Sequence, residues 1–488
     1  MTTQNASRRV VLRGLGALAL MGAAGAAGVR YATQAGAATA TGTLNIPTLL
    51  SSTDDNGTKV FTLSMQTGTA VLRTGLTSTT AGFNGSYLGP TIKVNNGDSV
   101  RMDVTNNLSE VSTVHWHGLH VPPSVDGGPQ NTIAAGTTYS PAFTINQGAC
   151  TLWYHPHALG TTAKQISSGL AGMLIVNDSS TGAAALPTDY GVDEFPLIVQ
   201  SVPVNASGVI QYTTAGLTSS STTFPVIVNG ANAASATPTL NVDVNRVRFH
   251  VLNASITDII TITRTDGASF TQVATDAALL AAPLSVTSLR LVAGERAEVV
   301  LDITSASSIT LQATVTAGGA RGGSGTTSVV TVTSTATTAA SSLPGTLNTF
   351  TALDTSSPSA TRTIALSNSG NTMYINGVAG TTMAAMESNE IMTTVGALEV
   401  WTITNATGLI HSFHLHDVPF QVLSVNGVAP TGALAQWKDT IEMASQTTVK
   451  IAMQFTDYSD DTYAYMLHCH NAIHEDEGMM TMLMVMAA

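Results

Sequence analysis

The interpretation of the whole 488-residue chain depends on one stretch near its end, Tyr465-Met466-Leu467-His468-Cys469-His470-Asn471-Ala472-Ile473-His474. In a β-strand successive side chains point to opposite faces, so Cys469 points away from the two histidines that flank it. One covalent path would then join two different metal sites. His474 and Met479 follow Cys469 at five and ten residues. With a second imidazole they would complete the trigonal set of a blue-copper site, which is two histidines, a thiolate and a weak thioether.

Histidine is concentrated at four places in the chain. Ten of the twelve histidines fall into four groups: His115 and His117; His155 and His157; His411, His414 and His416; His468, His470 and His474. Each group contains an i, i+2 pair, which puts both rings on one face of a strand. His411 and His474 are left to join Cys469 and Met479. The other eight imidazoles suit copper better than magnesium or calcium, which prefer oxygen ligands, and three coppers could hold them all.

These groups and their neighbours resemble the motifs of the multicopper oxidases, the family of laccases, bilirubin oxidases and the bacterial copper efflux oxidase. The resemblance extends from about Gly85 to Met486. It rests on His115-Trp116-His117-Gly118, on Trp153-Tyr154-His155-Pro156-His157, on His411-Ser412-Phe413-His414-Leu415-His416, and on His468-Cys469-His470 through Met479.

The resemblance implies four copper ions and a ligand set for each. The type 1 copper would take His411, Cys469, His474 and the axial Met479; the type 2 copper His115 and His414; and the type 3 pair His117, His155, His157, His416, His468 and His470. By the same resemblance, a donor gives single electrons to the type 1 copper. They cross through Cys469 to its flanking histidines, and four of them reduce dioxygen to two waters.

Two carboxylates near the motifs are expected to supply the protons that this reaction consumes. Asp126 is similar to the acid that the family places near the type 2 copper, and Glu475 resembles the family's second proton-relay acid. Carboxylates suit this role because their surroundings can shift their affinity for protons. The alternatives are a turn residue before Gly127-Gly128 for Asp126, and membership of a solvated acidic run for Glu475.

Residues 1–37 are interpreted as a cleaved export signal. Arg8 and Arg9 precede a short apolar run, and Ala35-Gly36-Ala37 is a small-residue cleavage pattern. The paired arginines mark the twin-arginine route, so we expect a periplasmic or extracellular protein. The apolar run is short and rich in Gly and Ala, so we expect no membrane anchor after cleavage.

Removing residues 1–37 takes away four arginines and no acid, so the net charge of −12 becomes −16. Such a surface repels phosphate backbones and argues against nucleic acid as a partner.

An internal repeat of about one domain length organises the chain. Val100-Arg101-Met102-Asp103-Val104-Thr105-Asn106 recurs as Val247-Arg248-Phe249-His250-Val251-Leu252-Asn253 and as Glu399-Val400-Trp401-Thr402-Ile403-Thr404-Asn405. The alternation of apolar and polar residues predicts a strand with one buried face in each copy. We therefore predict an all-β protein of three consecutive Greek-key β-sandwich domains, which the resemblance identifies as cupredoxin-like. Their predicted ranges are 43–178, 194–333 and 343–488.

The predicted ligands all lie in the first and third domains, so the eight-histidine site should form where these two meet, with the second domain as a spacer. Glycine-rich residues Gly318 to Thr327 are expected to form a loop in that domain. His250 is expected to be structural and His120 to lie at the surface or behind a ligand. Because Cys469 is needed as a thiolate, Cys150 should be a buried free cysteine rather than half of a disulfide.

The electron donor is the least specified part of the prediction. Phenols, aromatic amines and low-valent metal ions, including cuprous ion, are all candidates. Members that oxidise cuprous ion carry an acid four places before the first type 1 histidine and a methionine-rich insertion, whereas Thr407 stands at that place here. Met480, Met482, Met484 and Met486 would share one face of a strand, where core packing is preferred to a metal-relay site.

Two other functions remain open at this stage. A copper-free binding protein is known on this fold among exported, division-associated relatives, but all four ligand motifs are intact here. A copper nitrite reductase would have no use for paired ligands such as His155 and His157. We expect an oxidase that acts as a monomer on dioxygen and a small donor.

Overall fold

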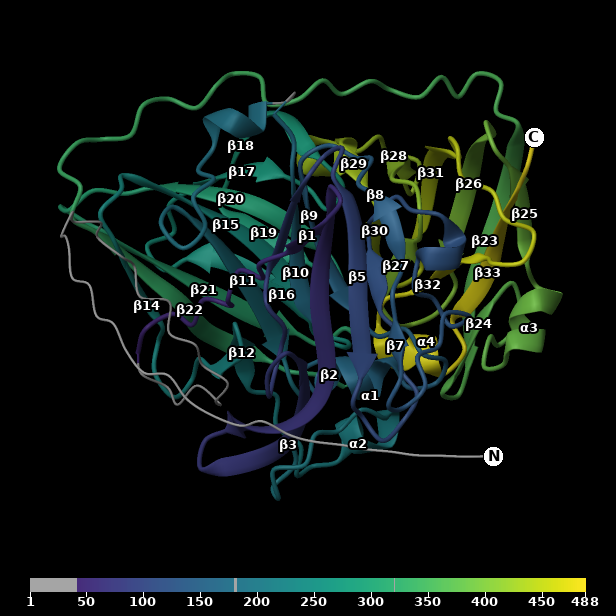
Figure 1. Cartoon of the computed structure of the whole chain (residues 1–488), viewed down its shortest axis with the longest axis horizontal. Helices are drawn as coiled ribbons and strands as arrows, with labels where there is room; N and C mark the ends of the chain where they lie inside the picture. Colours follow the sequence, from purple (N-terminus) through teal and green to yellow (C-terminus); the bar gives the residue numbers. More distant parts are fainter. Residues whose placement is uncertain (1–41, 180–181, 320) are drawn as a thin grey trace, which may run out of the picture. The chain divides into compact units, whose positions relative to one another are not determined.

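A computed structural model describes residues 42–179, 182–319 and 321–488. These residues form six β-sheets, arranged along the chain as three pairs, so the all-β prediction is confirmed (Figure 1). The predicted export signal lies outside the described residues. No helix in the described ranges combines the length and the apolar character that crossing a membrane requires.

The first sandwich pairs a six-stranded sheet with a four-stranded one. The six-stranded sheet contains β1 (Thr53–Asp55), β2 (Thr58–Arg73), β3 (Leu76–Phe83), β5 (Ser99–Asn106), β7 (Thr138–Tyr139) and β8 (Ala142–Thr144). The other has the order β4 (Ile92–Asn95), β10 (Gly172–Asn177), β9 (Cys150–His155) and β6 (His115–His117). Residues from both sheets, including Phe61 and Trp116, form one buried core.

The second sandwich has seven strands in one sheet and five in the other. The first has the order β13 (Ala231–Asn232), β12 (Val226–Val228), β11 (Glu194–Ser201), β15 (Arg246–Asn253), β20 (Arg296–Asp302), β17 (Phe270–Ala274) and β18 (Leu279–Val286). The second has the order β14 (Thr239–Val242), β22 (Gly325–Ser334), β21 (Ser308–Thr316), β16 (Ile259–Arg264) and β19 (Ser288–Leu291). Gly325 pairs with Val315, so the predicted glycine-rich loop ends sooner than expected, at residue 324.

The third sandwich carries two of the four histidine groups. Its six-stranded sheet has the order β24 (Thr372–Ile375), β23 (Ala360–Ser369), β26 (Leu398–Asn405), β31 (Thr448–Gln454), β28 (Phe420–Val425) and β29 (Trp437–Lys438). Its five-stranded sheet has the order β25 (Ile391–Thr394), β33 (Met480–Met486), β32 (Tyr465–Cys469), β27 (His411–Leu415) and β30 (Thr440–Met443).

The internal repeat corresponds to β5, β15 and β26, each of which ends at its aligned asparagine. Asn106, Asn253 and Asn405 make the same three kinds of buried hydrogen bond. Each side-chain amide donates to a carbonyl oxygen four or five residues later and to one 27 to 38 residues later, and each side-chain oxygen accepts from the N–H two residues later. A buried backbone group without a partner is unfavourable, so one asparagine closes the same turn in all three domains.

The sandwiches exchange short segments at their boundaries. Thr43, placed by prediction in the first domain, bridges to Thr239 at the edge strand of the second, and Leu44 is buried in that second core. Leu347, placed in the third domain, is buried against Val273 and Val300 of the second. Apolar side chains in these linkers pack on the nearest open surface, which a sequence pattern cannot identify.

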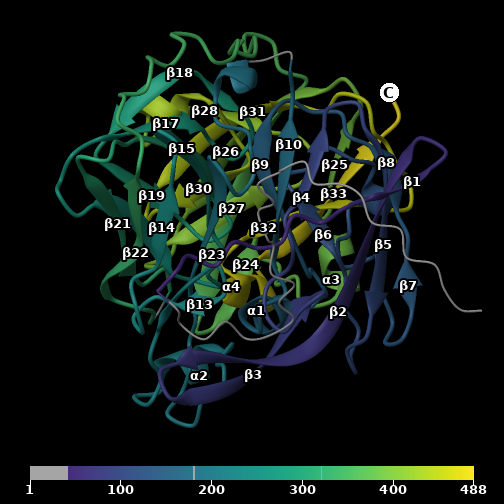
Figure 2. The ribbon, with the colours of Figure 1, turned by 60° about the vertical axis from the view of Figure 1, so that its left-hand side comes forward.

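Short helices connect the strands, and two of them meet between the first and third sandwiches. The helices in the described ranges are α1 (Thr162–Ser167), α2 (Thr214–Thr218), α3 (Met383–Ser388) and α4 (Ala472–Asp476), with 3-10 turns η1 (Pro123–Val125), η2 (Gly182–Ala185) and η3 (Gly432–Ala435). Both views show α1 beside α4 (Figure 1, Figure 2), where the carboxylate of Asp476 accepts from the N–H groups of Thr162 and Ala163. An apolar cluster with residues of all three sandwiches, including Ile166, Ile198 and Ile473, surrounds this contact.

Candidate metal centre

Strand pairing brings the histidine groups of the first and third sandwiches together. On β6 and β9, His115 stands opposite His155, and on β27 and β32, His414 stands opposite His468. His157, His416 and His470 follow the ends of their strands. The eight rings, here called the eight-histidine cluster, are all buried and comprise His115, His117, His155, His157, His414, His416, His468 and His470.

Nitrogen atoms in this cluster converge at the spacing of metal ligands. The Nε2 atom of His468 lies 3.1 Å from that of His157 and 3.2 Å from that of His416. The Nδ1 atom of His117 lies 3.1 Å from Nε2 of His470. Two nitrogens bound to one ion at about 2.0 Å in tetrahedral geometry would be about 3.3 Å apart.

Hydrogen bonds to the far side of the rings leave the converging nitrogens free. His115 Nδ1 donates to Asp126 O, His155 Nδ1 to Pro156 O, and His414 Nδ1 to Asp439 O, each at 2.9 Å. In all three rings Nε2 is buried without a hydrogen-bond partner among the described residues. Buried nitrogens that lack partners and face one another fit a metal ion.

Burial lowers the pKa of several rings in the cluster, which favours the neutral form that metal ligation requires. It lowers the pKa of His157 to about 3, and it lowers the pKa values of His155, His414 and His470 well below the ordinary value. Nearby rings add to this effect, since two imidazolium charges would repel each other. The unshared pairs of the imidazoles are therefore available to a cation at neutral pH.

The second ligand group, here called the sulfur set, contains His411, Cys469, His474 and Met479. The two Nδ1 atoms lie 3.0 Å apart, and Sγ of Cys469 lies 3.4 Å from Nδ1 of His411 and 3.8 Å from that of His474. Met479 is buried in the same core, and its N–H donates to His474 O at 2.9 Å. Burial raises the pKa of the Cys469 thiol to about 12, so a metal ion would have to displace its proton.

Thr407 has a function that the sequence did not indicate. Its hydroxyl lies 2.8 Å from Nε2 of His411 and donates to Asn405 Oδ1 at 2.8 Å. The hydroxyl therefore accepts from Nε2–H, which leaves Nδ1 of His411 facing the sulfur. At this position, four residues before the first predicted type 1 histidine, the ring thus has a neutral hydrogen-bond partner and not an acid.

Both predicted proton-relay acids lie against the eight-histidine cluster. Asp126 Oδ2 accepts from Nδ1 of His416 at 2.7 Å. Glu475 on α4 is buried, with Oε1 3.4 Å from Nδ1 of His157 and Oε2 3.1 Å from Nδ1 of His468. Neither oxygen of Glu475 has a hydrogen bond of good geometry within the described residues. The solvated-run alternative is therefore wrong for Glu475, because α4 turns its side chain inward.

Comparison with known proteins identifies the architecture. Multicopper oxidase family models match residues 64–181, 151–336 and 354–488. The chain belongs to the multicopper oxidase family. It is 32% identical to the multicopper oxidase mco of Staphylococcus haemolyticus, over 88% of this chain and 90% of that protein. It is also 31% identical to the cell division protein FtsP of Pectobacterium atrosepticum, over 83% of this chain and 85% of that protein.

Solved structures of multicopper oxidases share the fold. One is CueO from Ochrobactrum sp., described as a bacterial laccase-like multi-copper oxidase with activity towards lignin model compounds and lignosulfonate. It matches with a TM-score of 0.79 and 30% identity, over 91% of this chain and all of that one. The three sandwiches are therefore cupredoxin-like, as predicted. Family membership and the histidine clusters together support a copper-binding oxidoreductase that uses dioxygen and a reducing substrate.

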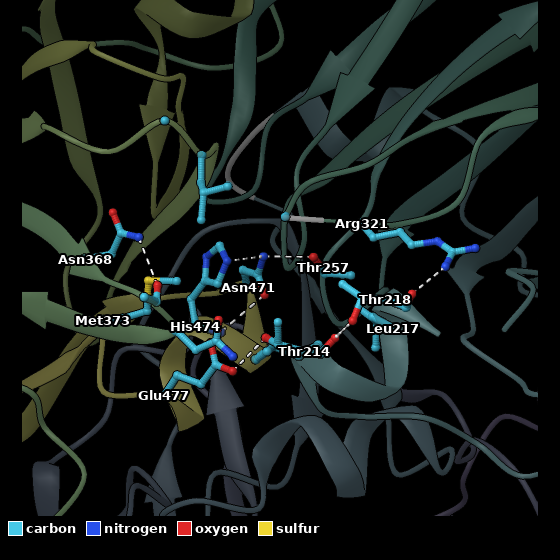
Figure 3. A pocket seen from close by; sticks show the side chains of 16 residues that line it. Thr214, Leu217, Thr218, Thr257, Arg321, Asn368, Met373, Asn471, His474 and Glu477 are labelled. Atoms are coloured by element: carbon cyan, nitrogen blue, oxygen red, sulfur yellow. Dashed lines mark hydrogen bonds between the residues drawn. The ribbon is translucent and has the colours of Figure 1, made fainter. Parts of the chain in front are cut away.

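A pocket of about 300 Å³ opens beside His474, between the second and third sandwiches (Figure 3). The His474 ring lies 3.4 Å from the amide of Asn471, which donates to Thr257 at 2.8 Å. Thr214 on α2 donates to Glu477 across the pocket at 2.7 Å. Its lining is mostly hydroxyls, amides and aliphatic groups.

A buried acid braces the glycine-rich loop that walls this pocket. Asp258 Oδ2 accepts from Ser201 Oγ at 2.6 Å and from the N–H of Gly323 at 2.7 Å. Burial raises its pKa to about 6. The folded protein thus binds this proton more tightly than the unfolded chain, and the stability it contributes is present below pH 4 and lost as pH rises through 6.

Replacing Asp258 by asparagine should remove this dependence. A shift of about two pKa units corresponds to about 3 kcal/mol, so the stability of Asp258→Asn relative to the natural protein should rise by about that much between pH 4 and pH 7. Urea unfolding at both pH values measures it, with exposed Asp461→Asn as the control. A relative stability that does not change with pH would contradict the prediction.

The two histidines outside the motifs are held by carboxylates. His250 is buried between Glu194 and Glu298, at 3.0 and 3.3 Å, which fits the predicted structural role. His120 lies between Asp417 and Asp457, at 2.7 Å from each.

The two cysteines are free and buried. Met480, Met482 and Met484 are buried together with Met466 and Met386, as core packing predicts.

The second domain supplies no ligand from the predicted set, but its loop before β20 contacts the cluster. A Cβ atom on Gly294 would lie only 2.6 Å from the His470 ring. Ser412, beside a ligand of the third domain, donates to Ala293 O at 2.7 Å. Long-range packing of this kind leaves no local motif, since it depends on how the sandwiches meet.

Proposed function

We propose that this protein is an oxidase that removes single electrons from phenols or aromatic amines and reduces dioxygen to water. The observation that carries the proposal is the covalent continuity of the two ligand groups. Cys469 belongs to the sulfur set, while its neighbours His468 and His470 belong to the eight-histidine cluster. Four phenols would yield four phenoxyl radicals, and their four electrons and four protons would convert one dioxygen to two waters.

Four copper ions are the proposed cofactors. The sulfur set would hold a type 1 ion, His115 and His414 a type 2 ion, and two triplets a type 3 pair. The triplets are His157, His416 and His468, and His117, His155 and His470. When bound, the ions supply a one-electron acceptor in the sulfur set and a dioxygen-reducing centre in the cluster.

The chain's own groups prepare this chemistry. The backbone that joins Cys469 to its two neighbours provides a fixed route between the ligand groups. Asp126 and Glu475 place carboxylate oxygens against rings of the cluster, where they can pass protons inward. Burial of all eight rings excludes bulk water, which limits the escape of partly reduced oxygen.

The pocket beside His474 favours an organic donor over cuprous ion. Among the described residues that line the pocket, Met373 has the single sulfur atom, and His474 is the single histidine. Soft cuprous ion prefers several such ligands. A ring with hydroxyl or methoxy groups would instead find the amides of Asn371 and Asn471 and the acid of Glu477.

Export by the twin-arginine route, a periplasmic or extracellular location and a monomeric state complete the proposal. The export route and the location rest on Arg8 and Arg9 before the short apolar run within residues 1–37.

Copper content and donor preference test the proposal together. The purified protein should bind about four copper ions per chain and consume oxygen faster with a dimethoxyphenol than with cuprous ion. Faster uptake with cuprous ion would support the metal-oxidising alternative. A protein that binds no copper under loading conditions would contradict oxidase function and favour a binding role, which the similarity to FtsP suggests. A two-copper protein that reduces nitrite would also overturn it.

A further inference from the structure

A fully buried arginine of the second sandwich lies next to the eight-histidine cluster. Arg296, at the start of β20, uses all five of its N–H donors. Nε donates to Thr151 O of the first sandwich at 2.9 Å, and the two amino groups donate to Gly294 O and Asp276 O of the second. The same two groups bind the carboxylate of Asp439, in the third sandwich, at 2.7 and 2.6 Å. This bidentate pair therefore joins all three sandwiches at one point.

Asp439 in turn orients two predicted ligands. Its backbone oxygen accepts from Nδ1 of His414 at 2.9 Å. Its Oδ1 atom accepts from the hydroxyl of Thr440 at 2.7 Å and lies 3.4 Å from Nε2 of His117. The same hydroxyl lies 3.3 Å from Nε2 of His117. One residue thus contacts a proposed type 2 ligand and a proposed type 3 ligand.

His117 is turned the opposite way from the rings described above. His115, His155 and His414 bond through Nδ1 and leave Nε2 free, whereas His117 presents Nδ1 to the cluster and Nε2 to Thr440 and Asp439. The hydroxyl proton of Thr440 is donated to Asp439, so its oxygen can only accept from His117. Nε2 therefore carries the proton of His117, and Nδ1 keeps its unshared pair for a metal ion.

Close packing leaves the pair little freedom to move. Gly118 has φ +81°, and a Cβ atom there would lie 2.6 Å from both Arg296 Nη2 and Asp439 Oδ2. Glycine directly after His117 is thus required both by its backbone conformation and by the position of the ion pair. The last residue of the motif His115-Trp116-His117-Gly118 therefore makes room for Arg296, which lies nearly 180 positions later in the chain.

We infer that Arg296 and Asp439 are positioning residues for the copper cluster, and that Arg296 brings the second domain into the assembly of that site. The inference deepens the proposed function and rests on it. Arg296 holds the Asp439 carboxylate in place, the carboxylate holds the Thr440 hydroxyl, and the hydroxyl selects the tautomer of His117. Loss of any one of these three contacts allows the ring proton of His117 to move from Nε2 to Nδ1, which removes one ligand from the cluster.

The competing explanation is an ion pair that only holds the sandwiches together. Arg248 provides a control of the same kind. It is also buried, its Nε and one amino group both donate to Oε2 of the acid Glu298, and its other amino group donates to a carbonyl of another segment, Pro187 O. Neither residue of that pair contacts a predicted ligand nitrogen of the eight-histidine cluster through its hydrogen bonds. A purely structural role predicts equal effects of Arg296→Lys and Arg248→Lys.

The test compares Arg296→Lys, Asp439→Asn and Thr440→Val with Arg248→Lys. Copper per chain, the electron paramagnetic resonance spectrum of the type 2 ion and the urea midpoint of copper-free protein are measured for each. The first three variants should lose copper from the cluster with about 10- to 100-fold weaker affinity and show an altered type 2 spectrum, while the blue absorption of the sulfur set persists. Arg248→Lys should keep the natural copper content and spectrum.

Thr440→Val keeps the inference testable even where the charge variants fold poorly, because it removes one hydroxyl and nearly preserves volume. Natural copper content and an unchanged spectrum in folded Thr440→Val would overturn the inference. So would equal copper loss in Arg248→Lys. A natural protein that binds no copper would instead refute the proposed function, so the two failures are distinguishable.

Discussion

Replacing Cys469 by serine is expected to abolish the blue absorption and to reduce oxygen uptake with a phenol to the background of copper-free protein. A hydroxyl is a poor ligand for the copper of the sulfur set, and the bonded route from that set to His468 and His470 loses its sulfur. The ligands of the eight-histidine cluster stay in place, because the backbone of β32 is unchanged. Copper per chain should fall by about one ion, and the type 2 resonance should remain.

Cys150→Ser is the matched control for this substitution. Cys150 is also buried and free, but it lies in the core of the first sandwich, where Gln147 donates to its sulfur at 3.3 Å. That variant should keep its colour and turnover. Oxygen uptake at the natural rate by Cys469→Ser would contradict the proposed division between an electron-accepting site and an oxygen-reducing site.

Glu475→Gln is expected to lower kcat by about 10²- to 10⁴-fold while all copper ions stay bound. The carboxylate is buried against His157 and His468, and its oxygens have no hydrogen bond of good geometry among the described residues, which leaves them available to accept a proton. An amide of the same shape cannot do this. Oxygen uptake at saturating donor and copper analysis measure the two effects separately.

Glu477→Gln tests whether another acid on the same segment also delivers protons to the cluster. Its side chain accepts from Thr214 in the donor pocket, so its replacement should change KM for the donor more than kcat. Asp126→Asn, which affects the acceptor of His416 Nδ1, should resemble Glu475→Gln. Natural kcat in Glu475→Gln with full copper content would exclude the acid from proton delivery.

Much of the site could be predicted because most of the predicted metal ligands lie within a few residues of one another in the sequence. An i, i+2 histidine pair on a strand has one geometric outcome, and the register of β6 with β9 then aligns His115 with His155. The repeat that ends at Asn106, Asn253 and Asn405 was visible because each copy forms the same strand and turn. These features depend on residues a few positions apart, which is why no tertiary information was needed.

What the order of residues determined was therefore the all-β class, the family and the set of histidines, cysteine and methionine that could bind copper. Only the assembled sandwiches decided that Glu475 points inward and that Arg296 lies beside His117. The physical reason is distance along the chain. The positions of Glu475 and Arg296 depend on the packing of segments with no fixed spacing between them, and burial favours a partner for a charge at such a junction.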